Sequence, residues 1–273
     1  MSSNKQPVVI SSFLWLDPRA KHTGTYEFGP RHVEVLFKQL DKARKSPEFG
    51  GYDISFALFS DCPVASDFPL DLVTYYPLWD RFREMGRCFV RLGLFKQDFR
   101  NKMAPPNAIW INIDLDVVIT DPEGFLRVML KDHEQAFTGY RDSKNPRCYS
   151  GALWKLDPRY GDVSHVYGTF DHMYQVCGHS GGIEPFFNSW SAPGEFVGSD
   201  QCWITTALGE FTYPRKIDNL TDFVYDYWTI EDLPGGALPE RCVCVFMNGK
   251  RRDSSMSEFQ QKHDWIIENW VNV

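Results

Sequence analysis

A short acidic motif constrains this chain more than any other feature: Asp114 and Asp116 directly follow an apolar run over residues 109–113. That run is rich in β-branched residues, as expected of a central strand covered on both faces. In an extended strand, residues two apart point to the same side about 7 Å apart, and an unpaired carboxylate there costs several kcal/mol. The motif therefore predicts a cation between the carboxylates, and a divalent ion that itself holds phosphates is the simplest candidate.

The residues around the motif indicate whether it binds a ligand or only forms a turn or a helix cap. An Asp-x-Asp tripeptide alone is most simply a solvated turn or a helix cap. Here a second apolar run over residues 117–119 follows at once, and Asp121-Pro122 is typical of a helix start. Strand, acidic pair, short strand and helix start form a specific order, which favours the ligand-binding interpretation.

Hydrophobic periodicity predicts an α/β fold. Strands over residues 7–13 and 52–59 flank a helix that opens at Gly29-Pro30, and this order favours a parallel sheet. Residues 161–198 lack periodicity and are expected to wrap over the site. Further strands are expected at residues 136–140, 149–154 and 242–247, and helices at 79–99, 121–131, 202–208 and the end of the chain. The sequence predicts one Rossmann-like domain over residues 1–273, with a mostly parallel central sheet flanked by helices.

Composition excludes several classes of protein. The seven cysteines are odd in number and mostly isolated, so neither a disulfide framework nor a zinc site is expected. The net charge of −7 argues against a protein whose affinity comes mainly from neutralising a phosphate backbone. No apolar run is long enough for a membrane span, and residues 1–6 are polar, so we expect a cytoplasmic protein, bacterial or in a phage-infected cell.

Four polar groups follow predicted strands or open predicted helices, where open α/β sheets bind ligands. They are Asp114 with Asp116, Ser150-Gly151, Asp200-Gln201, and Asn248-Gly249-Lys250. Residues 91–95 (RLGLF) and 137–141 (FTGYR) complete an ordered set that spans most of the chain. In this set the chain resembles the GT-A type nucleotide-sugar glycosyltransferases, in the glycogenin-like and lipopolysaccharide-galactosyltransferase-like group, and is most similar to compact bacterial and phage members.

The resemblance implies a GT-A fold and a hexosyl- or pentosyltransferase that takes its sugar from a nucleoside diphosphate donor, with uridine as the base and with retention of configuration. Asp114 and Asp116 would hold Mn²⁺ or Mg²⁺ on the donor diphosphate. Lys250 would add a second positive contact, with Gly249 allowing close approach. On the sugar side, Ser150 and Gly151 would help bind the donor. Asp200 and Gln201 would lie near the reacting carbon.

The chain departs from these relatives at two positions. Where relatives have a metal-binding His, this chain has Asn248, whose amide oxygen is a weaker third ligand. Tyr149 stands where relatives often carry Asn, before the Ser-Gly turn. His263 is a possible substitute ligand, although a lone His on a terminal helix more often packs or lies on the surface.

Alternatives therefore stay open. One is a nucleotide-sugar-binding module with weakened catalysis. A nucleotidyltransferase is disfavoured because no phosphate-binding Gly-rich loop follows the first strand. A saccharide, a protein and a modified base in phage DNA are all compatible acceptors.

Overall fold

The computed structural model describes residues 5–14, 30–60, 71–78, 87–141, 148–178, 200–209, 220–247 and 263–271. The strands are β1 (Gln6–Leu14), β2 (Tyr52–Ser60), β3 (Thr74–Pro77), β4 (Ile109–Ile113), β5 (Val117–Ile119), β6 (Phe137–Gly139), β7 (Leu153–Leu156), β8 (Val224–Asp226) and β9 (Cys244–Phe246). The α-helices are α1 (Pro30–Arg44), α3 (Gln97–Arg100), α4 (Pro122–Leu130), α5 (His165–Gly178), α7 (Asp200–Ala207), α8 (Tyr227–Glu231) and α10 (Asp264–Ile266). Short 3-10 segments are η2 (Pro47–Phe49), η3 (Arg87–Phe95), η4 (Pro158–Tyr160) and η5 (Pro234–Gly236), and η7 (Ile267–Val271) is a π-helix.

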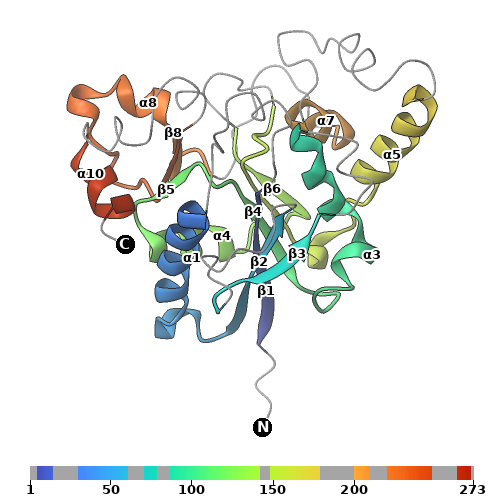
Figure 1. The fold of residues 1–273 in the computed structure, drawn as a ribbon, viewed down its shortest axis with the longest axis horizontal. Helices are drawn as coiled ribbons and strands as arrows, with labels where there is room; N and C mark the ends of the chain where they lie inside the picture. Colours follow the sequence, from blue (N-terminus) through green and yellow to red (C-terminus); the bar gives the residue numbers. More distant parts are fainter. Residues whose placement is uncertain are drawn as a thin grey trace.

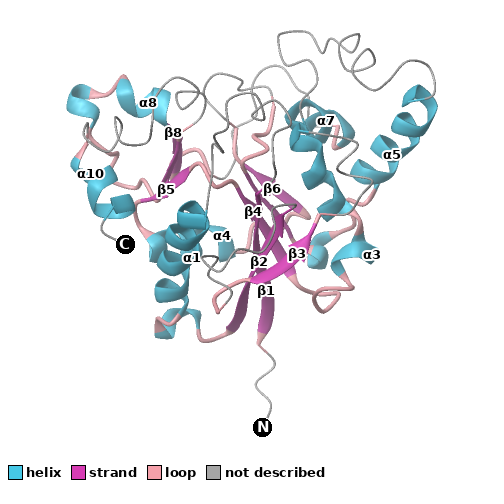
Figure 2. Ribbon diagram, viewed as in Figure 1, coloured by secondary structure: helices cyan, strands magenta, loops and turns pink. Residues whose placement is uncertain are grey.

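The larger sheet has the strand order β3-β2-β1-β4-β7-β6. Its strands lie in the middle of the molecule, with helices around them (Figure 2). β1 runs parallel to β2 and β4, and β2 runs parallel to β3. β7 is antiparallel to both of its neighbours, so it alone opposes the common direction. The predicted mostly parallel sheet, with the acidic motif at the end of a central strand, is confirmed. A second sheet has the order β5-β9-β8.

Helices cover both faces of the larger sheet, which explains the near-continuous apolar strands (Figure 1). Alternate residues of β1 divide between two cores. Val8 and Ile10 join the core under α1 and α4, whereas Val9 and Phe13 join the core under η3, α5 and α7. A third core joins β5 and β9 to α8, α10 and η7. None of the helices in the described ranges is long and apolar enough to cross a membrane.

Local signals located several boundaries correctly. Asp121 begins the predicted helix at α4, because its carboxylate accepts a hydrogen bond from the Gly124 N–H at 2.9 Å. The expectation of an irregular segment was wrong at α5, whose residues include Gly168 and many poor helix formers. Packing of Val166 and Phe170 into the second core outweighs that weak propensity.

Two other boundaries differ from the expectation. The strand expected from residue 149 begins only at Leu153, after a turn. In place of one helix over residues 79–99, the described part of that range holds η3 and the start of α3.

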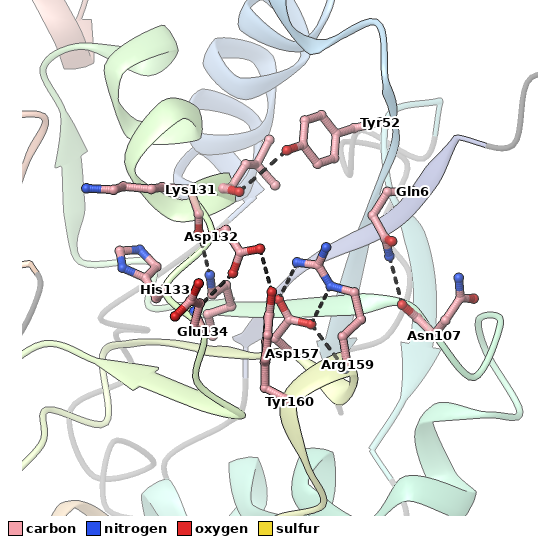
Figure 3. Close-up of polar contacts among 12 residues, drawn as sticks. Gln6, Tyr52, Asn107, Lys131, Asp132, His133, Glu134, Asp157, Arg159 and Tyr160 are labelled. Carbon is pink, nitrogen blue, oxygen red and sulfur yellow. Dashed lines mark hydrogen bonds and ion pairs between the residues drawn. The ribbon is translucent and has the colours of Figure 1, made fainter.

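Polar contacts connect the loops at the end of the larger sheet where β1 begins (Figure 3). The acidic motif lies at the opposite end, after β4. The Gln6 side-chain amide donates to the Asn107 carbonyl at 2.8 Å. The Arg159 guanidinium donates twice to the buried Asp157 carboxylate, at 2.9 and 2.6 Å. These contacts fix the loops at the amino end of the parallel strands.

Lys155 of β7 is the one nearly inaccessible lysine of the described chain, with 1% of its surface exposed. Its ammonium donates to the Lys131 carbonyl, directly after α4, at 2.9 Å. Burial lowers the pKa of this lysine from 10.5 to about 8, because a charged ammonium is poorly solvated there.

We therefore expect a pH-dependent contribution to stability. Between pH 8 and 10.5 the unfolded chain holds up to one more proton at Lys155 than the folded chain does, so the folded state gains stability as pH rises. The gain over that range is about 3 kcal/mol. The free energy of unfolding of wild type and of Lys155→Met, measured in urea at pH 8 and at pH 10.5, tests this prediction. The difference between the two proteins cancels the effect of other titrating groups, such as Cys242, whose pKa burial raises to about 11 and whose contribution has the opposite sign. Parallel pH curves for the two proteins would contradict the assignment.

Candidate functional site

The acidic motif lies where the chain leaves one sheet and enters the other. β4 ends at Ile113, a turn follows, and β5 begins at Val117 in the smaller sheet. The expectation that Asp114 and Asp116 share one side of an extended strand was therefore wrong. The turn is what allows the chain to change sheets, and it separates the surroundings of the two carboxylates.

Asp114 closes the larger sheet and faces an arginine. Its backbone N–H donates to the Ala152 carbonyl at 2.8 Å, which extends the β4–β7 pairing by one residue. One carboxylate oxygen lies 3.0 Å from Nη2 of Arg91, and 21% of the Asp114 side chain is exposed. The cation next to Asp114 is thus a side chain of the protein.

Arg91 links two carboxylates that are far apart in sequence. Its Nη1 lies 3.5 Å from an oxygen of Asp200, the first residue of α7. Only 8% of the Arg91 side chain and 3% of the Asp200 side chain are exposed. Buried charges of this kind persist only when they are paired, and guanidinium presents its donors in a fixed plane. The result is an ordered Asp114–Arg91–Asp200 cluster.

Gly151 lies directly against this cluster, and its lack of a side chain leaves space for Arg91 and Asp200. A Cβ atom at this position would lie 2.5 Å from one Asp200 oxygen and 2.7 Å from Nη1 of Arg91, so no larger residue fits without displacement. The preceding Ser150 shapes the turn: its backbone N–H donates to the Tyr140 carbonyl at 2.6 Å, and its hydroxyl accepts from the Ala152 N–H at 3.1 Å. The structure therefore brings Ser150-Gly151 together with Asp114 and Asp200.

The same turn is fastened to α7. The Tyr149 backbone N–H donates to the Thr205 hydroxyl, and that hydroxyl donates to the Gln201 carbonyl, both at 2.8 Å. The Tyr149 ring is largely buried, with the Arg141 guanidinium 4.0 Å above it. Tyr149 thus serves as a packing residue in the described structure. The role expected for the Gln201 side chain stays a prediction.

Asp116 has different neighbours, from the far side of the turn. Its backbone carbonyl accepts from the Met247 N–H at 2.8 Å, next to β9. Asp116 lines a small space, too narrow for a water molecule, together with His32 of α1 and Trp270 of η7. Asp116 therefore lies between the smaller sheet, the first turn of α1 and the C-terminal helix.

The remaining predicted ligands divide into two cases. Asn248, Gly249 and Lys250 lie outside the described residues, so their roles stay predictions. His263 is described and packs: its Nε2 lies 3.1 Å from the Tyr227 hydroxyl oxygen, and its ring stacks on Trp265. The structure thus gives the candidate substitute ligand a packing role.

The metal-binding potential rests on oxygen donors. Within the part of the chain that the structure describes, no three His, Cys, Asp or Glu side chains are grouped as a metal cage. Asp114 and Asp116 remain as two hard carboxylate donors on one turn. Carboxylate oxygens are the donor type that Mg²⁺ and Mn²⁺ prefer, and substrate phosphates often complete the shell of these ions in proteins.

Arg91 is the site residue that sequence reasoning missed. It was part of the RLGLF segment that supported the resemblance, but it received no role of its own. A signal was present: a charged residue stands inside an otherwise apolar run over residues 88–95. Such a residue needs a partner when buried, just as Asp114 does.

Comparisons with known proteins complete this description. The chain matches no family model and no curated protein. Among solved structures it is similar to a glycosyltransferase involved in glycosylation of the major capsid of PBCV-1, with 9% identity over 92% of this chain and 96% of that one and a TM-score of 0.46. It is also similar to the galactosyltransferase LgtC in complex with donor and acceptor sugar analogs, with 10% identity, coverage of 89% and 88%, and a TM-score of 0.49.

A third similar structure is mouse xyloside xylosyltransferase 1, with 11% identity, coverage of 89% and 98%, and a TM-score of 0.46. All three are named as glycosyltransferases, the class that the sequence resembles.

Proposed function

We propose that this protein is a metal-dependent glycosyltransferase that moves a sugar from a nucleoside diphosphate donor, UDP by preference, with retention of configuration. One observation carries the proposal. Arg91 is held between Asp114 and Asp200, against Gly151, at the carboxyl end of central strand β4. The ordered motifs that resemble the GT-A enzymes contribute every one of these residues.

The cluster suits recognition of a sugar. Carboxylates accept hydrogen bonds and a guanidinium donates them, so the set can match hydroxyl groups that do both. Because Arg91 and Asp200 are nearly buried, their orientation is fixed before a ligand arrives. In the proposed arrangement Asp200 and Gln201 lie on the sugar side, near the reacting carbon. The negative charge of Asp200 would favour the oxocarbenium-like transition state.

The diphosphate side is proposed to lie at Asp116 and Lys250. By formal charge, Asp114, Asp116 and Asp200 carry two more negative charges than Arg91 balances. A divalent cation matches that excess. Asp114 and Asp116 would hold Mn²⁺ or Mg²⁺ with Asn248 as a weak third ligand, and the bound ion would stabilise negative charge on the leaving diphosphate. Lys250 would contribute a further positive contact.

Hydrolysis of UDP-glucose and UDP-galactose, measured with and without Mn²⁺, tests the proposal. Wild type is expected to hydrolyse at least one of them only with the metal. Asp114→Ala and Asp116→Ala are expected to lower that rate by about 100-fold, because each removes a metal ligand. Asp53→Ala, on an exposed position of β2, is the matched control and is expected to behave as wild type.

The possible results separate the alternatives. Normal turnover by both Asp114→Ala and Asp116→Ala would contradict the metal role. Calorimetric binding of donor and metal, with neither hydrolysis nor transfer to any acceptor, would favour the binding module. Saccharides, proteins and DNA with modified bases are the acceptors to compare once a donor is identified, and the anomer of the product reports retention.

A further inference from the structure

Asn112 is a polar residue inside the central strand, and its surroundings set it apart. It lies in β4, two residues before Asp114, and it is completely buried. Its Nδ2 donates to the Gly151 carbonyl at 3.2 Å. Its Oδ1 is also buried and has no hydrogen-bond partner among the described residues.

This arrangement costs stability. A buried acceptor without a partner forfeits its interaction with water, and an apolar side chain would fill the same position without that loss. On this face the strand neighbours are Trp110 and Trp154, which are fully packed, and the buried Ser11 of β1. The indole Nε1 of Trp154, like Oδ1 of Asn112, has no hydrogen-bond partner among the described residues. A buried asparagine here is therefore a poor choice for packing, and its one hydrogen bond is the contact that distinguishes it.

That hydrogen bond acts on the glycine at the centre of the site. Gly151 carries the backbone against which Arg91 and Asp200 pack, at distances that leave no room for a side chain. The adjacent Ala152 carbonyl is held by the Asp114 N–H at 2.8 Å. Asn112 of β4 and Asp114, directly after β4, thus hold two successive carbonyls of the turn.

We propose that Asn112 is a positioning residue for the sugar side of the site: it fixes Gly151, and through Gly151 it sets where Asp200 and Arg91 stand. The expected effect on catalysis rests on the proposed function, whereas the expected effect on the position of Gly151 does not. Asn112 itself touches no substrate. Its effect belongs to the sugar side and not to the nucleotide side, where Asp116 lies.

Two substitutions separate this role from general packing. Asn112→Leu keeps the size but removes the donor to Gly151. Asn112→Asp keeps the shape and exchanges the donor for an oxygen, so an ionised carboxylate would face the Gly151 carbonyl as a second acceptor. Both variants therefore keep the volume of the side chain and lose the donor to Gly151, so a loss that they share reports the hydrogen bond and not packing.

The experiment uses the full chain and measures kcat and KM for UDP-glucose or UDP-galactose hydrolysis with Mn²⁺, together with the calorimetric Kd for UDP. We expect both variants to lose about 100-fold in kcat at neutral pH, the usual cost of displacing a reacting group by about 1 Å. The Kd for UDP should stay within twofold of wild type. Ser11→Ala is the control, because Ser11 is the paired residue on β1 and its hydroxyl donates only to the Ile111 carbonyl.

A crystal structure of Asn112→Leu supplies a readout that needs no activity: Gly151 should move relative to Arg91 and Asp200. If wild type neither binds nor hydrolyses a nucleotide sugar, the proposed function fails and this structure alone decides the positioning role. Wild-type kcat in both variants, or an unmoved Gly151, would overturn the inference. Equal losses of UDP affinity and kcat would also overturn it, since they would indicate a structural role.

Discussion

Arg91→Ala is expected to lower the free energy of unfolding by about 3 to 5 kcal/mol, because it leaves two carboxylates without their buried partner. Arg91 lies 3.0 Å from Asp114 and 3.5 Å from Asp200, and 8% of its side chain is exposed. The same change is expected to abolish donor hydrolysis, since Asp200 loses its orientation. Urea unfolding and the UDP-sugar assay measure the two effects.

The control for this prediction is an arginine in an exposed ion pair. Arg127 contacts Glu48 at 2.8 Å, but 56% and 43% of these side chains are exposed. Arg127→Ala should cost only about 0 to 1 kcal/mol, because water replaces the lost contact. If Arg91→Ala and Arg127→Ala lowered the free energy of unfolding equally, burial of the Arg91 cluster would contribute nothing to stability.

A charge-free version of the cluster separates stability from function. The triple variant Arg91→Met, Asp114→Asn, Asp200→Asn removes all three charges and should recover most of the stability lost in Arg91→Ala. It should remain inactive, because neither the carboxylates nor the guanidinium are present. Activity in the triple variant would contradict the proposed site.

The second large effect is expected at Gly151. Gly151→Ala places a Cβ atom 2.5 Å from Asp200 and 2.7 Å from Arg91, so the turn or the ion pair must move. Overpacking of this kind costs about 1 to 3 kcal/mol. Donor hydrolysis should fall by about 100-fold, because displacement of about 1 Å at a reacting group has that effect. Chemical unfolding and the hydrolysis assay measure the two losses.

Gly168 of α5 provides the matched glycine. No atom lies within 4 Å of a Cβ added there, so Gly168→Ala should be neutral or stabilise the protein by about 0.5 to 1 kcal/mol. Activity should be unchanged. A Gly151→Ala protein as stable and active as Gly168→Ala would mean that the Arg91–Asp200 contact is not needed at the turn.

Local sequence patterns determined a large part of the fold. The apolar runs of β1, β2 and β4 and the helical spacing of α1 are properties of neighbouring residues, so their order alone predicted a mostly parallel sheet. The cap at Asp121 is equally local. The same reasoning failed at α5, where contacts with distant segments outweigh weak helix propensity.

The site divides in the same way. The sequence by itself singled out Asp114, Ser150-Gly151 and Asp200 as candidates, because polar residues next to apolar runs and at helix starts are visible in a single chain. Only the tertiary structure decided which of them meet, and that Arg91 is the cation at Asp114. It also decided that the chain changes sheets between the two carboxylates, so that Asp116 lines a space with His32 and Trp270. The physical reason is that a charged residue in an apolar run shows, from the local sequence alone, that it needs a counter-charge. The residue that supplies the counter-charge can be distant in sequence, so only the folded structure identifies it.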